Sequence, residues 1–94
     1  MSQEFTAQMS MRAGRWRLYV VLLNTTDPWP EHTFAPAPIP TFTDRARALS
    51  GLGFEPVPGA EWIWTEYSET LDDPASPVCL IAAVQVRSRA EADA

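Results

Sequence analysis

Cys79 and His32 are the only residues of their types in the 94-residue chain, and together they could form a thiol nucleophile with its general base. Such catalysis needs the imidazole within hydrogen-bonding reach of the sulfur and a group that orients it. Cys79 instead lies in an apolar segment, where cysteine is usually a small buried hydrophobic residue, and His32 follows Glu31 in a Pro-rich segment. We therefore predict no catalytic residues and expect a protein that is not an enzyme.

Carboxylates are concentrated in residues 61–73, which contain no basic residue. Paired carboxylates could act as general acid and base or could bind a hard cation. The segment lacks the alternating oxygen ligands and central glycine of an EF-hand, and no metal-ligand spacing involves the single His and Cys, so we predict no metal site and no cofactor. The open interpretations are a solvated surface and an acidic docking patch for a basic partner.

Two indoles, Trp62 and Trp64, lie two residues apart and would share one face of a strand. They could stack a ligand ring or form the centre of a protein interface, and the alternative is core packing beneath a helix. With the neighbouring acids they define the predicted interaction surface: Trp62, Trp64, Glu66, Glu69, Asp72 and Asp73.

The charge balance limits the classes of partner that the chain could bind. A net charge of −5 and a pI of about 4.6 argue against direct binding to nucleic acid or to an anionic membrane. All basic residues are Arg, which excludes lysine chemistry within the chain. A single Cys allows no intramolecular disulfide, and neither a secretion signal nor an apolar stretch of membrane-spanning length is visible, so we expect a cytoplasmic protein.

Three segments are predicted strands, because β-branched and aromatic residues fill them between turn signals: 15–23, 60–67 and 78–86. The first and last are apolar on both faces for much of their length, which indicates strands inside a sheet. A short fourth strand is possible at 54–57, before the Pro58-Gly59 turn.

Five prolines within residues 27–40 predict an extended crossover that Trp29, Phe34 and Ile39 pin to the body. A helix should follow, with Thr41 as its N-cap, Asp44 completing a capping box and Gly53 ending it. Its predicted apolar stripe contains Phe42, Ala46, Leu49 and Leu52 and leaves Arg45 and Arg47 outside.

These elements predict an α+β fold in β-α-β-β-β order, with one helix packed on one face of a three- to four-stranded, mostly antiparallel sheet. We expect a single domain at 15–87, a flexible N-terminal tail at 1–13, where no hydrophobic period is apparent, and a second flexible tail at 88–94. One helix would leave apolar strand surface uncovered. Either a second copy or the Pro-rich segment would then cover it.

The sequence also resembles a family of short, uncharacterised actinobacterial proteins carried as a domain of unknown function. The resemblance rests on the succession RLYVVLL, DPWP, RARALSGLGFEPV, AEWIWTEYSE and DDPASPVCLIA, and it covers residues 15–87. It supports the domain limits and implies no activity, cofactor or catalytic residue.

We therefore expect an interaction module, with self-association through the sheet as a homodimer and an unidentified protein as a further possible partner. One alternative is a small-molecule binder that uses the two indoles as a stacking platform. The other is an acidic decoy that occupies a nucleic-acid-binding protein.

Overall fold

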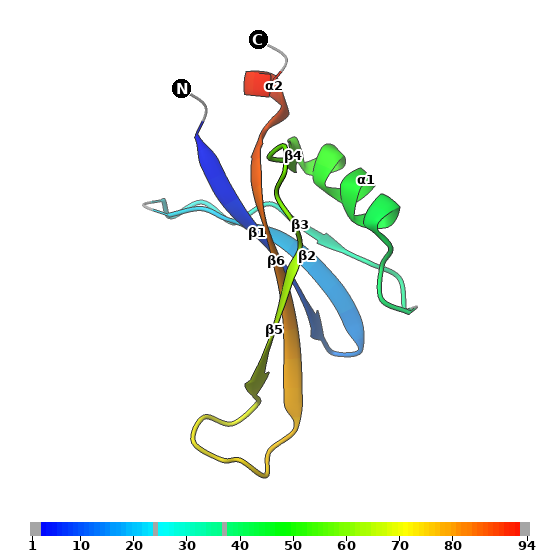
Figure 1. Cartoon of the computed structure of the whole chain (residues 1–94), viewed down its shortest axis with the longest axis vertical. Helices are drawn as coiled ribbons and strands as arrows, with labels where there is room; N and C mark the ends of the chain where they lie inside the picture. Colours follow the sequence, from blue (N-terminus) through cyan, green and yellow to red (C-terminus); the bar gives the residue numbers. More distant parts are fainter. Residues whose placement is uncertain (1–2, 24, 37, 93–94) are drawn as a thin grey trace.

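A computed structural model describes residues 3–23, 25–36 and 38–92 and shows an α+β fold with one long helix beside an antiparallel sheet (Figure 1). The elements are β1 (Glu4–Arg12), β2 (Arg15–Val21), β3 (Glu31–Thr33), α1 (Phe42–Leu52), β4 (Phe54–Pro56), β5 (Ile63–Ser68), β6 (Val78–Ser88) and α2 (Arg89–Ala92). The predicted fold class is confirmed. The predicted strand number and order are wrong, because the sheet has six strands.

Strand β1 occupies the segment that we predicted to be a flexible tail. Its alternate residues Phe5, Ala7 and Met9 point to the core, and Ala7 and Met9 are fully buried. A two-residue turn joins β1 to β2, and both its residues have positive φ, 53° at Ala13 and 79° at Gly14. This geometry suits a tight hairpin of right-twisted strands, and Gly14 adopts it without a steric penalty. The N-terminal segment is therefore a central strand.

The sheet order is β3-β2-β1-β6-β4, with every pairing antiparallel. Strand β5 pairs with residues 78–83 of β6 on the edge that β4 uses further along, because β1 occupies the other edge. The eleven-residue β6 is thus the longest strand of the sheet and joins three partners. Its central position confirms the expectation for the last apolar strand.

One face of the sheet and helix α1 enclose the core. Strands β1, β2 and β6 supply alternate residues to it, and α1 adds Ala48 and Leu49. The buried apolar residues are Ala7, Met9, Trp16, Leu18, Val20, Ala48, Leu49, Ala82, Val84 and Val86.

Helix α1 has the predicted ends and a different buried face. The Thr41 hydroxyl accepts a hydrogen bond from the Asp44 backbone N–H, the Asp44 carboxylate accepts one from the Thr41 backbone N–H, and Gly53 ends the helix at a φ of 94°. Arg45, predicted to lie outside the apolar stripe, is 6% exposed, whereas Phe42, predicted to lie within it, is 72% exposed. The guanidinium is held among aromatic rings that a hydrophobic pattern cannot anticipate.

The Pro-rich crossover contains the edge strand β3, a position where proline-flanked segments are tolerated. Phe34 packs against the core, and Ile39 remains half exposed. At the other end of the chain, residues 89–92 form α2 where we predicted a tail. Within the described ranges, neither helix is long and apolar enough to cross a membrane.

Candidate functional site

The feature that departs most from a closed fold is a hairpin that extends beyond the body (Figure 1). The last residue pair between β1 and β6 joins Ser10 to Ile81, whereas β5 and β6 stay paired down to Ser68 and Val78. We call residues 66–80 the arm. It consists of two strand ends and their connecting loop, and among the described residues no third strand pairs with it. Isolated two-stranded hairpins are marginally stable in water, so the arm is suited to a supporting contact.

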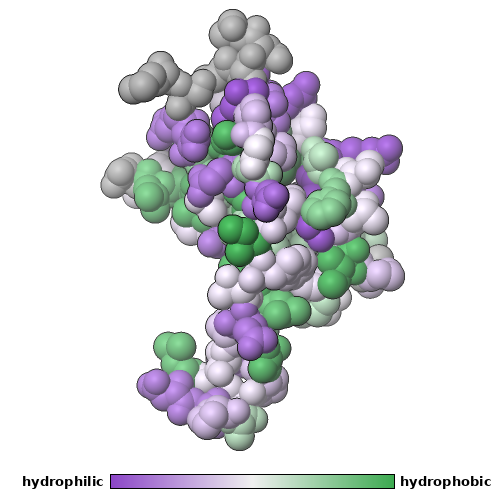
Figure 2. All heavy atoms as spheres, viewed as in Figure 1, coloured by the Kyte–Doolittle hydropathy of each residue, from purple (hydrophilic) through white to green (hydrophobic). Residues whose placement is uncertain are grey.

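Large apolar side chains are exposed on both faces and at the tip of the arm. Tyr67 lies on one face, Val78 and Leu80 lie on the other, and Leu71 in the loop is 83% exposed. Figure 2 shows hydrophobic groups mixed with hydrophilic ones along the narrow lower part of the molecule. Such a concentration is typical of a contact surface rather than of scattered surface residues.

The loop at the tip of the arm is ordered by its own hydrogen bonds. The Asp73 carboxylate accepts a bond of 2.9 Å from the Ala75 backbone N–H, and the Ser76 hydroxyl donates one of 3.0 Å to the Asp73 carbonyl. Asp72 holds a positive φ of 66°. All four predicted carboxylates are exposed and lie on the arm: Glu66, Glu69, Asp72 and Asp73. The structure therefore brings the acidic half of the predicted surface together.

The indole half of the predicted surface is packed differently. The side chain of Trp62 contacts the core, and Trp64 meets the buried Trp16 edge-on at a centroid distance of 5.7 Å. The Arg45 guanidinium lies 5.0 Å from the Trp62 ring centroid and 5.6 Å from that of Trp64. The core and Arg45 thus occupy part of both rings, and Trp64 remains 38% exposed. Trp62 and Trp64 anchor the base of the arm.

Arg45 is the polar centre of this aromatic cluster. Its Nε donates a hydrogen bond of 2.9 Å to the Pro40 carbonyl, while its buried Nη1 has no hydrogen-bond partner among the described residues. Burial lowers the pKa of Arg45, since it penalises the charged form. Attraction to the surrounding ring faces offsets part of this penalty.

The structure does not bring His32 and Cys79 together. His32 lies in β3 at one edge of the sheet and packs edge-on against Phe34, whereas Cys79 lies in the arm opposite Tyr67. Cys79 is half-buried. Burial, and then the neighbouring Cys79, raises the pKa of Tyr67. Among the residues that the structure describes, no group of three or more His, Cys, Asp or Glu side chains could hold a metal ion.

A groove on the sheet face opposite α1 was missed in the sequence. Its volume is about 550 Å³, and Gln8, Ser10 and Arg12 of β1 line it together with Tyr19 of β2 and Trp29. A third of this lining, three residues of nine, belongs to the segment that we interpreted as a tail. Alternation of Thr6, Gln8 and Ser10 with apolar neighbours was the available signal.

The chain matches the family described as "Family of unknown function (DUF6303)" over residues 3–94. The predicted resemblance to a family of unknown function is thereby confirmed, and the match reaches further toward the N-terminus than the resemblance did. Comparison with curated proteins and with solved structures gave no match.

Proposed function

Since the chain belongs to this family of unknown function, its function must be argued from its own surface, and we propose that it is a protein-interaction module that self-associates through its arm. The observation that supports this proposal is the arm. Exposed apolar residues and two unpaired strand edges project from the body without support. Unpaired edges and exposed apolar side chains both favour association.

Charge complementarity favours a second copy as the occupant. The arm carries four carboxylates, and the chain has no basic residue between Arg47 and Arg87. Exposed basic residues instead flank the β1–β2 turn, where Arg12 and Arg15 have no ion-pair partner within the described residues. Two copies related by a two-fold axis could each place the acidic arm against the partner's Arg12 and Arg15.

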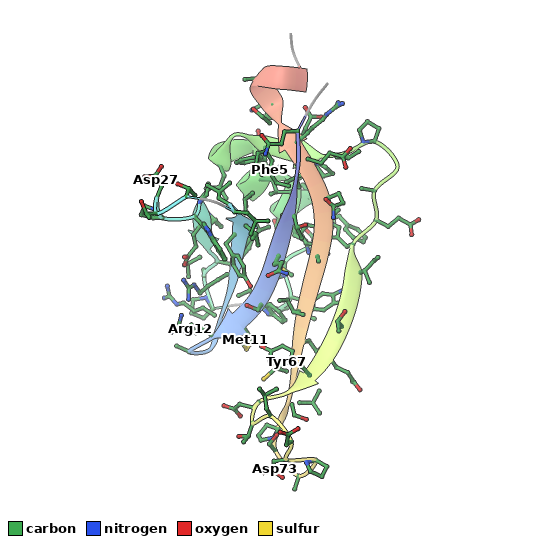
Figure 3. All side chains as sticks on the ribbon, turned by 90° about the vertical axis from the view of Figure 1, so that its left-hand side faces the viewer. Phe5, Met11, Arg12, Asp27, Tyr67 and Asp73 are labelled. Carbon is green, nitrogen blue, oxygen red and sulfur yellow. The ribbon has the colours of Figure 1, made fainter. Side chains whose placement is uncertain are left out.

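The position of the basic turn supports this arrangement. Beyond Ile81 the β6 edge that faces β1 is unpaired, and Figure 3 shows Met11 and Arg12 at the end of β1, with Tyr67 and Asp73 further out on the arm. Met11 pairs with Trp16 and so lies on the face opposite Arg12 and Arg15, but it is half exposed and offers an apolar contact at the same end of the hairpin. An arm from a second copy would meet both apolar and basic groups there.

The acidic-decoy alternative is less well supported. A surface that imitates nucleic acid needs regularly spaced negative charge. The arm instead alternates its carboxylates with exposed tyrosine, leucine and valine side chains, which suit a mixed protein interface.

Sedimentation velocity across a concentration series tests the proposal. We expect a dimer whose population rises with concentration and falls with salt, because ion pairs contribute to it. Leu71→Glu should shift the equilibrium to monomer, whereas Leu23→Glu, at a leucine 78% exposed and outside the arm, should leave it unchanged. A chain that remains monomeric up to about 1 mM would refute self-association.

Charge reversal tests the docking surface itself. Glu69→Arg combined with Asp72→Arg should weaken the dimer, and Arg12→Glu combined with Arg15→Glu should do the same. Mixing the two double variants should restore a heterodimer, because opposite charges then face each other again in both of its contacts: the reversed arm meets the reversed turn, and the unaltered arm meets the unaltered turn. If mixing restores nothing, the arm does not dock on the basic turn.

A further inference from the structure

The groove opposite α1 is built from three elements and lies apart from the exposed apolar residues of the arm. Strands β1 and β2 form its floor, and residues 27–31 form its wall. Asp27 and Arg12 both line it, and Figure 3 shows these two residues well apart on the same side of the view. None of the residues that line it belongs to the buried core. The groove is therefore a surface whose side chains are available for a ligand.

An aromatic pair forms the wall. The rings of Tyr19 and Trp29 are stacked with centroids 6.0 Å apart and planes 19° apart. The Trp29 indole N–H donates a hydrogen bond of 2.8 Å to the Leu22 carbonyl, which fixes the ring. Trp29 nevertheless remains 44% exposed. A large ring that is held in place and left half exposed is a preorganised platform for another planar group.

The floor presents polar groups that the fold leaves unused. Gln8 pairs with Tyr19 and Ser10 pairs with Arg17 across β1 and β2, which places these four side chains on one face. Gln8 and Ser10 are half-buried, and neither side chain forms a hydrogen bond within the described part of the chain. The amide and the hydroxyl can both donate and accept, so they suit a ligand with hydroxyl groups.

Charges of opposite sign mark the two ends of the groove. Arg17 is paired with Glu31, so its charge is already compensated. Asp27 remains as an exposed carboxylate beside Trp29, and Arg12 has no ion-pair partner among the described residues of its own chain. Gln8 and Arg12 are four strand residues apart, which corresponds to about 13 Å. A matching ligand has a donor group at its ring end and an anionic group at its other end.

We propose that this groove binds a small molecule that joins an amino-substituted planar ring to an anionic group through a hydroxylated spacer, the chemistry of an aminopurine nucleoside monophosphate. The ring would stack on Trp29 and donate its amino hydrogens to Asp27. The spacer hydroxyls would meet Gln8 and Ser10, and the phosphate would pair with Arg12. Arginine favours phosphate because its planar fork can donate two parallel hydrogen bonds.

The test follows the indole N–H signals of the ¹⁵N-labelled protein during titration with adenosine 5′-monophosphate. We expect the Trp29 signal to shift, and we expect the Trp64 signal, on the opposite sheet face, to remain in place. Adenosine lacks the phosphate, and inosine 5′-monophosphate lacks the amino group. Each should bind at least about tenfold more weakly, the discrimination expected when one charged or polar contact is lost.

Variants separate the groove from the fold and from the arm. Trp29→Leu and Arg12→Gln should each weaken binding about tenfold, whereas Arg47→Gln, an exposed arginine on α1 that does not line the groove, should not. Because the proposed dimer would place a partner's acidic arm against Arg12, the monomeric Leu71→Glu variant should bind the nucleotide at least as tightly as the unaltered chain. The nucleotide carries every group that the proposal requires. An unmoved Trp29 signal, or equal binding of all three compounds, would overturn it.

Discussion

Replacing Met9 by alanine tests strand β1, which the sequence pattern did not predict. Met9 is fully buried in β1, between Leu18 of β2 and Ala82 of β6, and both of these neighbours are fully buried as well. The substitution removes the γ-methylene, the sulfur and the terminal methyl. Transfer of these groups from the core accounts for about 2.4 kcal/mol, at about 0.8 kcal/mol for each methylene-sized group. The cavity left behind raises the expected loss to about 3 kcal/mol.

A loss of this size is easy to measure in a small domain. The free energy of unfolding of a chain of this length is about 5 to 14 kcal/mol, so the variant should lose a large share of it. Urea unfolding followed by tryptophan fluorescence gives the difference, and the melting temperature should fall by about 12 °C or more. Met11→Ala is the matched control, because Met11 lies in the same strand and is 51% exposed. If both variants lose less than about 0.5 kcal/mol, the N-terminal segment does not form a buried strand.

The remaining predictions concern helix α1. Arg45→Met should change the free energy of unfolding by less than about 1 kcal/mol, because methionine keeps the ring contacts and removes a buried charge. Arg45→Ala should lower it by about 3 kcal/mol. Urea unfolding midpoints of the two variants test the difference. The hydrogen bond from the Thr41 backbone lowers the pKa of Asp44 below 3.8, so the stability that this cap contributes is present above that value and is lost as the pH falls through the lower folded pKa. Asp44→Ala should abolish this part of the acid dependence in urea titrations at low pH. Gly53→Ala should lower the melting temperature because Gly53 has a φ of 94°, whereas Gly51→Ala, inside the helix and with open space around it, should raise it; calorimetry reads both signs.

Local signals were the most predictable part of this chain. The capping box of Thr41 and Asp44, and the glycine end of α1, involve neighbouring residues whose geometry depends little on the rest of the fold. The arm was predictable in part, because the sequence shows the acidic loop and the apolar strand that follows it. Its projection beyond β1 was not, since strand register depends on pairing partners far apart in the sequence.

The missing strand has a specific physical cause. The interpretation that residues 1–13 have no hydrophobic period was wrong, because residues 4–12 alternate between polar and apolar with a period of two. Their apolar members include alanine and methionine, which lack the β-branched or aromatic character of typical strands. The following turn uses alanine at a positive φ instead of the usual asparagine or aspartate. Without β1, neither the groove nor the polar character of the sheet face opposite α1 could be predicted.

Strand β6 runs without a break from the arm into the layer beneath α1. A partner that binds Val78 or Leu80 therefore contacts one end of a strand whose other end, at Val84 and Val86, is part of the core. Binding of a partner to the arm should therefore raise the free energy of unfolding of the chain, because a partner that binds only the folded chain stabilises all of it. Binding at the arm should thus protect the core, as well as the arm, against unfolding.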